Sequence, residues 1–123
     1  RLYNLASCTM NVLDISPVKV GGFNYALRYD TIGLARRGNV AELEHTSNEI
    51  LLSEDYGPQP RLQSVIHEAM HAIIQLYYGG LSDPVLEEGI VTQLSQGWYQ
   101  VMRDNPRLLQ AFIELNEEQN ETK

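Results

Sequence analysis

Alternating apolar and polar residues mark the first half of the chain as rich in β-strands. Residues 19–30 place four apolar side chains on one side of an extended segment, Phe23, Tyr25, Leu27 and Tyr29. Residues 8–15 could form a further strand, and residues 40–46 and 49–54 predict two strands around a polar turn. We therefore expect a small antiparallel sheet of three or four strands.

From Arg61 onward the apolar residues recur at the three-and-four spacing of an α-helix. The apolar stripe of this first helix comprises Leu62, Val65, Ile66, Ala69, Ile73, Leu76 and Tyr77. Gly79 and Gly80 follow the stripe and predict the end of the helix, because glycine readily adopts the left-handed conformation that closes a helix C-terminus.

Two more helices are predicted after the glycines. Ser82 or Asp83 can cap the next helix, with Pro84 at its first position. Its apolar stripe includes Leu86, Ile90, Leu94, Trp98 and Val101. A last helix is expected from about Pro106 to Glu118. A sheet followed by helices is typical of the α+β class, and we expect residues 1–123 to form a single domain.

Charge and composition narrow the classes of function. The 123 residues carry a formal net charge of −7 and only 9 lysines and arginines. Nucleic acids and anionic membranes both attract basic surfaces, so we expect neither as a partner. The lone cysteine, Cys8, cannot form an internal disulfide, and we expect a buried or inert thiol.

No segment approaches the roughly 18 consecutive apolar residues that would span a bilayer. No basic segment followed by an apolar run opens the chain either. We therefore expect the protein in the bacterial cytoplasm.

Residues 67–71, HEAMH, match the pattern H-E-x-x-H. On a helix His67 and His71 lie one turn apart on the same face, so both imidazoles can bind one metal ion from the same side. Glu68 points to a neighbouring part of the surface, where it can reach a water molecule without being a ligand. This spacing predicts a zinc site with Glu68 as the general base.

An ordinary amphipathic helix with two surface histidines is the competing interpretation. However, two of the three histidines in the chain stand at ligand spacing around a glutamate. On a helical wheel the motif residues fall together with Ser64 and Gln75, away from the apolar stripe. We therefore expect the histidines on a continuous polar face that forms the floor of a cleft.

A catalytic zinc ion usually has three protein ligands and a water molecule. No histidine follows His71, and His45 is typical of a surface residue at a strand end. Glu87 and Glu88 are the better candidates, because the Gly-Gly turn should fold the next helix back toward the motif. Helical periodicity points Glu87 inward and leaves the choice open. Either acid could also simply be a helix N-terminal acid that the helix dipole favours.

Several segments together resemble a known family. VIHEAMHAI (65–73) and EEGIVTQLSQGWYQVMRDNP (87–106) are similar to small gluzincin-type zinc metallopeptidase-like proteins often encoded by phages and prophages, which are distantly similar to ImmA/IrrE-type proteases. EILL (49–52) matches the strand that precedes the motif helix in that family. The resemblance covers residues 40 to 110 or so, and GWYQVMRDNP is its more family-specific part.

The resemblance implies zinc-dependent hydrolysis of a peptide or protein substrate, with Glu88 as the third ligand beside His67 and His71. It extends the expected location to the cytoplasm of a phage-infected host cell. The strand EILL, as the sheet edge beside the cleft, could bind an extended substrate by strand addition. One position departs from the family pattern: Thr92 stands where the family has a supporting acid, and threonine cannot supply a carboxylate to orient an imidazole.

A non-catalytic zinc-binding module that acts in protein interaction, assembly or regulation is the alternative function. The intact Glu68 favours the enzyme, since a structural zinc site has no use for a general base. Thr92 and the small size favour the module, and a metal-free helical scaffold is a third interpretation. Tyr77 and Tyr78 lie near the motif in sequence, but no residue is identified that would stabilise a transition state.

Overall fold

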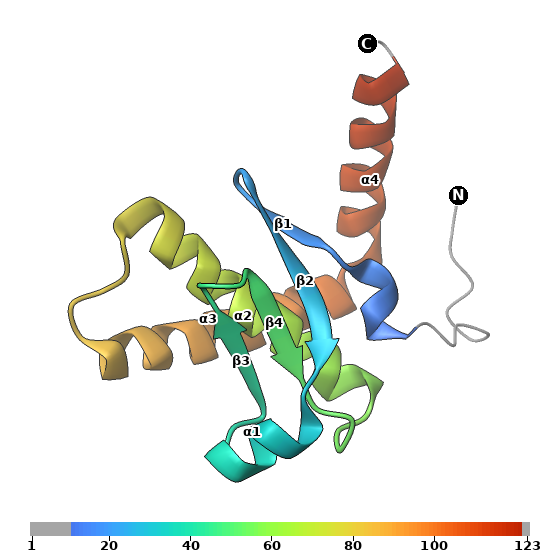
Figure 1. The fold of residues 1–123 in the computed structure, drawn as a ribbon. Helices are drawn as coiled ribbons and strands as arrows, with labels where there is room; N and C mark the ends of the chain where they lie inside the picture. The colour runs from blue at the N-terminus through green and yellow to red at the C-terminus, as the bar shows by residue number, and fades with distance from the viewer. Residues whose placement is uncertain (1–10, 122–123) are drawn as a thin grey trace.

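A computed structural model describes residues 11–121, and Cys8 lies outside the described residues. The chain first forms the short 3-10 helix η2 (Val12–Ile15) and then a region of strands with one small helix. Three long helices complete it, α2 (Pro58–Tyr78), α3 (Pro84–Asp104) and α4 (Pro106–Glu121) (Figure 1). The predicted α+β class is confirmed: a four-stranded sheet is followed by long helices.

The sheet has the strand order β1-β2-β4-β3. Its strands are β1 (Val18–Val20), β2 (Phe23–Tyr29), β3 (Ala41–Glu44) and β4 (Glu49–Leu52). β1 pairs with β2, and β3 with β4, in antiparallel fashion as expected. The central pair, β2 and β4, is parallel, so the expectation of a wholly antiparallel sheet is corrected at this pairing.

The parallel pairing follows from a helix that the hydrophobic pattern did not reveal. α1 (Thr31–Arg37) reverses the chain after β2, and Gly38 closes it in a left-handed conformation with φ 73°. β3 then runs along the far edge, and the hairpin to β4 brings that strand back beside β2. The helix has seven residues, and Leu34 is its one buried residue. A single buried position gives no repeating apolar pattern that a sequence could reveal.

The strand considered for residues 8–15 is wrong over its described part, which includes η2. The side chain of Asn11 caps this turn by accepting a hydrogen bond of 3.0 Å from the backbone N–H of Leu13. Such local side-chain bonds offer the backbone an alternative to strand pairing. The turn buries Val12 in the core.

The boundaries of the long helices agree closely with the sequence pattern. α2 begins at Pro58, three residues before the expected start, because proline fits the first helical turn. Gly79 ends it with φ 68°. Asp83 caps α3 through hydrogen bonds from the backbone N–H groups of Val85 and Leu86. α4 begins at Pro106 as predicted and continues to Glu121.

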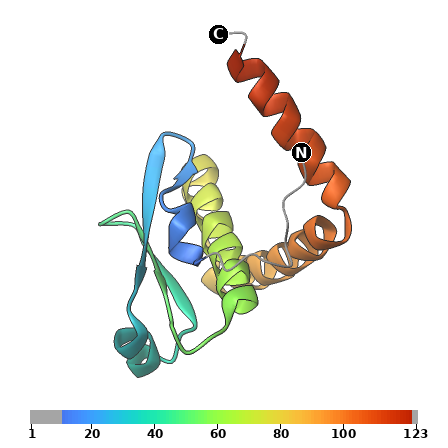
Figure 2. The same cartoon turned by 90° about the vertical axis from the view of Figure 1, so that its right-hand side faces the viewer.

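The main core lies between the sheet and α2 (Figure 2). Tyr25 and Leu27 of β2 point to the same face as Ile50 and Leu52 of β4, and Val65 of α2 packs against them. α3 packs on α2, and α4 projects away from these layers (Figures 1 and 2). Within residues 11–121, no helix combines the length and apolar character that crossing a membrane requires.

Candidate metal centre

The two histidines of the motif lie one turn apart on α2 with their rings side by side. Their ring centroids are 5.0 Å apart, and their side chains are 20% and 18% exposed. The polar face predicted for this part of α2 therefore exists, and it is partly covered by α3 rather than open to solvent. This burial favours a cleft floor over two ordinary surface histidines.

Glu88, in the first turns of α3, completes a group of three donor atoms. Its Oε1 lies 3.1 Å from Nε2 of His67 and 2.7 Å from Nε2 of His71. One ligand atom from each residue lies within 4.8 Å of the other two. His67, His71 and Glu88 therefore form a group that could hold a metal ion.

Glu87 contacts the opposite side of the His71 ring. Its Oε2 accepts a hydrogen bond of 2.6 Å from Nδ1 of His71, and its Oε1 accepts one of 3.0 Å from the backbone N–H of Leu81. Glu87 points inward, as periodicity indicates, and Glu88, which the resemblance implies as the third ligand, lies against both histidines. The two acids thus take different positions around one ring, because consecutive helical residues diverge by about 100°.

The carboxylates favour the protonated form of His71 when no metal is bound. Burial alone would lower the pKa of His71, but the hydrogen bonds to Glu87 and Glu88 outweigh it, and the net shift is upward. The N–H of Leu81 and then His71 lower the pKa of Glu87. For Glu88, burial raises the pKa, but the two histidines together lower it by more. The net shift is downward, so the carboxylate stays charged.

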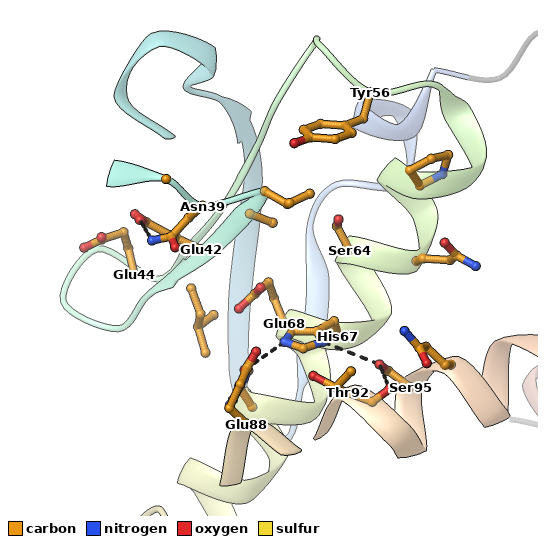
Figure 3. Close-up of a pocket in the computed structure, with 18 of the residues that line it drawn as sticks. Asn39, Glu42, Glu44, Tyr56, Ser64, His67, Glu68, Glu88, Thr92 and Ser95 are labelled. Carbon is orange, nitrogen blue, oxygen red and sulfur yellow. Dashed lines mark hydrogen bonds and ion pairs between the residues drawn. The ribbon is translucent and has the colours of Figure 1, made fainter. Parts of the chain in front are cut away.

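Glu68 is buried, with 7% of its surface exposed, and its carboxylate points toward the strand side of the cleft (Figure 3). The sequence placed Glu68 on a neighbouring part of the surface, within the polar face of a cleft floor, and its near-complete burial was not expected. Burial raises the pKa of Glu68 to about 7; the charge of Glu88 adds to this effect, and the nearby His71 opposes it. A carboxyl group with a pKa near neutrality can both accept and release a proton under ordinary conditions.

A cleft of about 950 Å³ surrounds these groups, between β3, α2 and α3 (Figure 3). Along one side it is lined by β3, which is an edge strand of the sheet formed by residues 11–121. The expected edge strand, EILL, is instead the internal strand β4, paired on both sides. The strand beside the cleft is therefore β3, one hairpin earlier in the chain.

Sequence reasoning missed two polar residues of the cleft, Ser95 and Tyr56. The hydroxyl of Ser95 lies 3.5 Å from Nδ1 of His67 and donates a hydrogen bond of 3.2 Å to the carbonyl of Thr92 (Figure 3). The spacing of Ser95 from Glu88, seven residues or two helical turns, could have suggested the shared face. Tyr56 lies in a turn before α2, where no periodicity indicates its direction.

The remaining candidates fall in different places. His45 and Thr92 line the cleft, but His45 does not belong to the group of converging donors. Tyr77 and Tyr78 are 68% and 74% exposed and do not line the cleft. The cleft has no lysine or arginine among its described lining residues, and four of them are glutamates, Glu42, Glu44, Glu68 and Glu88.

The donor set fits zinc. Two imidazole nitrogens and one carboxylate oxygen are a set of three protein ligands found in catalytic zinc sites. Donor atoms around a tetrahedral zinc ion are about 3.3 Å apart, given zinc–donor distances near 2.0–2.1 Å. The present separations of 2.7 and 3.1 Å need a small outward movement of Glu88, whose side chain is 57% exposed and free to make it.

No family model, curated protein or solved structure matches the chain. The capacity of His67, His71 and Glu88 to hold a metal ion is therefore inferred from their geometry.

Proposed function

We propose that the protein is a zinc-dependent metallopeptidase of the gluzincin type, as the resemblance to the phage and prophage proteins suggests. The single observation that carries this proposal is the convergence of His67, His71 and Glu88 beside the buried carboxyl of Glu68 in one cleft. A site with three protein ligands and an open side toward a cleft is the arrangement of catalytic rather than structural zinc.

His67 and His71 would hold zinc through Nε2, and Glu88 through Oε1. Zinc bound by such a set supplies Lewis acidity, which polarises a carbonyl oxygen and makes a water molecule easier to deprotonate. Glu87 keeps the proton of His71 on Nδ1, which leaves Nε2 free to act as a ligand once the second proton has gone. Glu87 thereby supplies, from another position, the supporting carboxylate that Thr92 lacks.

Glu68 is the general base in this proposal. Its carboxylate takes a proton from the attacking water and delivers it to the amine nitrogen that leaves. Burial raises the pKa of Glu68 to about 7 in the metal-free chain, which marks the carboxylate as a stronger base than an exposed one. Its burial supports this role, since a charged carboxylate without a structural partner is costly to bury.

The outer edge of β3 is the proposed binding place for the substrate backbone. An extended peptide can add to such an edge as a further strand, with its main chain hydrogen-bonded to the protein. The cleft runs along β3 from Ala41 to Glu44 and reaches the three donors, so a bound peptide would pass beside them. The proposed partner is therefore a peptide or an exposed extended segment of a protein.

The experiment that tests this function compares the wild type with Glu68→Gln. Both proteins should contain about one zinc per chain by mass spectrometry, but only the wild type should cleave a peptide library. Glu54→Gln provides the matched control, because Glu54 is exposed and lies outside the cleft. A wild type that lacks zinc at neutral pH, or that cleaves no better than Glu68→Gln, would contradict the proposal.

The alternative is a non-catalytic zinc module, and Thr92 in place of an acid is the observation that favours it. In that case zinc would stabilise the protein and Glu68→Gln would change nothing but stability. The same pair of proteins separates the two functions: zinc without cleavage in the wild type supports the module, and cleavage that depends on Glu68 supports the enzyme.

A further inference from the structure

Large apolar side chains remain exposed along the outer side of the helices. On α3 the predicted apolar stripe includes Leu94 and Trp98, which are 59% and 48% exposed. On α2, Ile73 and Tyr77 of its stripe are likewise exposed. Isolated soluble proteins rarely expose contiguous apolar patches of more than a few hundred Å². The helices therefore carry apolar faces that the described part of the chain does not cover.

An apolar groove of about 400 Å³ lies on this side, between α2 and α3. Met70 of α2 and three apolar residues of α3 line it, Leu94, Trp98 and Val101. Gln93 and Gln100 are its polar residues, and none of its described lining residues is charged. Such a groove suits an apolar helix face, with amide groups at its rim for hydrogen bonds.

Gly97 lies in this groove, in the middle of α3. A glycine inside a helix costs about 1 kcal/mol relative to alanine, so its presence there calls for a reason. No atom of residues 11–121 outside its own helix backbone and chain neighbours lies within 4 Å of the place where its Cβ would be, so no contact among these residues requires a glycine. A second backbone that packs closely over this position would require one.

α4 carries a matching apolar face, and within the described part of the chain it packs mainly against the neighbouring α3. Leu108, Phe112 and Leu115 lie at helical spacing and are 51%, 72% and 61% exposed. The helix leaves the body after Asn105 and extends away from it (Figures 1 and 2). A helix of this length is marginal in water unless its apolar face is covered.

We propose that two copies of the chain form a symmetric dimer by placing α4 of each copy in the α2–α3 groove of the other. Each α4 points away from its own body. A twofold axis lets both copies make the same contact, with each helix in the groove of the other copy. In such a pair each copy contributes two apolar surfaces, its groove and its α4, toward the about 800 Å² per partner that a stable interface needs.

Charge favours this pairing over direct contact between the two α4 helices. The polar side of α4 carries Glu114, Glu117, Glu118 and Glu121. Two such helices side by side would bring like charges together, which costs free energy. In the uncharged groove, by contrast, the acidic side faces solvent.

The experiment measures the mass of the full chain and two variants by sedimentation equilibrium. The wild type should have twice the monomer mass of 14.0 kDa. Phe112→Lys should raise the dimer dissociation constant about 30-fold or more, as expected for a central apolar residue of an interface. Gln110→Lys introduces the same residue on the other side of α4 and should leave the dimer intact.

Gly97→Ala distinguishes a loss of association from a loss of folding stability. In the monomer this change meets open space and should raise the melting temperature, because alanine favours a helix. In the dimer it should weaken association at least tenfold. A photoreactive group in place of Leu115 should crosslink to α3 of the other copy in a mixture of isotope-labelled and unlabelled chains.

Four results would overturn the dimer. A wild type that remains at 14.0 kDa at micromolar concentrations would show that the chain does not form a dimer. A dimer that Phe112→Lys does not weaken does not use α4. A dimer whose association Gly97→Ala leaves unchanged, or crosslinks formed only within one chain, would exclude the groove. None of these measurements depends on zinc or on cleavage, so they are independent of the proposed function.

Discussion

Oε2 of Glu87 lies 2.6 Å from Nδ1 of His71, on the side of the ring opposite the converging donors. A carboxylate in this position fixes the ring orientation and keeps a proton on Nδ1. The backbone N–H of Leu81 holds the other oxygen of Glu87, so the turn between α2 and α3 is tied to the same ring. The loop that brings Glu88 to the histidines therefore also orients one of them.

The two glutamates should contribute unequally to zinc binding. Glu88→Ala removes a ligand and should weaken zinc binding more than about 100-fold, whereas Glu87→Gln removes only an orienting carboxylate and should weaken it about 10- to 100-fold. Competition titration against a chromophoric chelator measures both affinities, with Glu54→Gln as the unaffected control. A larger loss in Glu87→Gln than in Glu88→Ala would reverse the two roles.

Glu68 should make the metal-free protein less stable as the pH rises. Its carboxyl pKa is about 7 in the folded chain and near 4.5 when unfolded, so only the folded state holds the proton between these values. The contribution of Glu68 to stability is therefore most favourable below pH 4.5 and declines until about pH 7. Glu68→Gln removes this effect and should raise the free energy of unfolding by on the order of 2–3 kcal/mol at pH 8.

Urea unfolding with a zinc chelator present, at pH 8 and at pH 4.5, measures this difference. The gain of Glu68→Gln over the wild type should nearly vanish at the lower pH. An equal gain at both pH values would mean that Glu68 is not titrating between them.

Arg37 should stabilise the fold in neutral but not in acid solution. Its guanidinium hydrogen-bonds Glu42 at 2.8 Å and Asp30 at 3.0 Å, and it lowers the pKa of both carboxyls. A lowered folded pKa means that the stabilisation is present above the unfolded pKa and is lost as the pH falls through the folded value.

Arg37→Met should accordingly lower the melting temperature at pH 7 and have little effect at pH 2.5. Arg36→Met is the matched control, because no hydrogen bond or ion pair is assigned to Arg36 in the described structure. The same loss at both pH values would indicate a packing role for the Arg37 side chain instead of an ionic one.

Truncating the Ile50 side chain should lower the free energy of unfolding more than truncating most other residues. It is completely buried in β4 between the neighbouring strands and α2. Ile50→Ala should cost about 2–5 kcal/mol, because it removes apolar contacts and leaves a cavity. Ile32→Ala makes the same change where the side chain is 69% exposed and should cost far less. Urea unfolding of both variants compares them, and similar losses would contradict the central place of β4.

The helices and the ligand pair could be predicted from sequence because both depend on neighbours along the chain. The C-terminal end of α2 and the start of α3 follow from Gly79 and Asp83, which act on backbone groups within one turn. His67 and His71 share a face because residues four apart on any helix do so. Local geometry was sufficient for these features.

The edge strand and the burial of Glu68 could not be predicted in this way. β3 rather than β4 borders the cleft because α1, with one buried anchor, reverses the chain and allows β2 and β4 to pair in parallel. Strand order depends on where distant segments meet, and an alternating pattern reports only which face of a strand is buried. Glu68 is buried because β3 and α3 close over its part of α2.

The sequence by itself determined the α+β class, the three long helices and a histidine pair with a glutamate at metal-binding spacing. Periodicity left the choice between the two acids open and the resemblance favoured Glu88; only the tertiary structure shows which of them lies against both histidines. Glu87 and Glu88 are adjacent in sequence and equally acidic, and a rotation of about 100° on α3 separates them. The turn at Leu81 and the packing of α3 on α2 set that rotation, so Glu88 meets both histidines and Glu87 meets the far side of one.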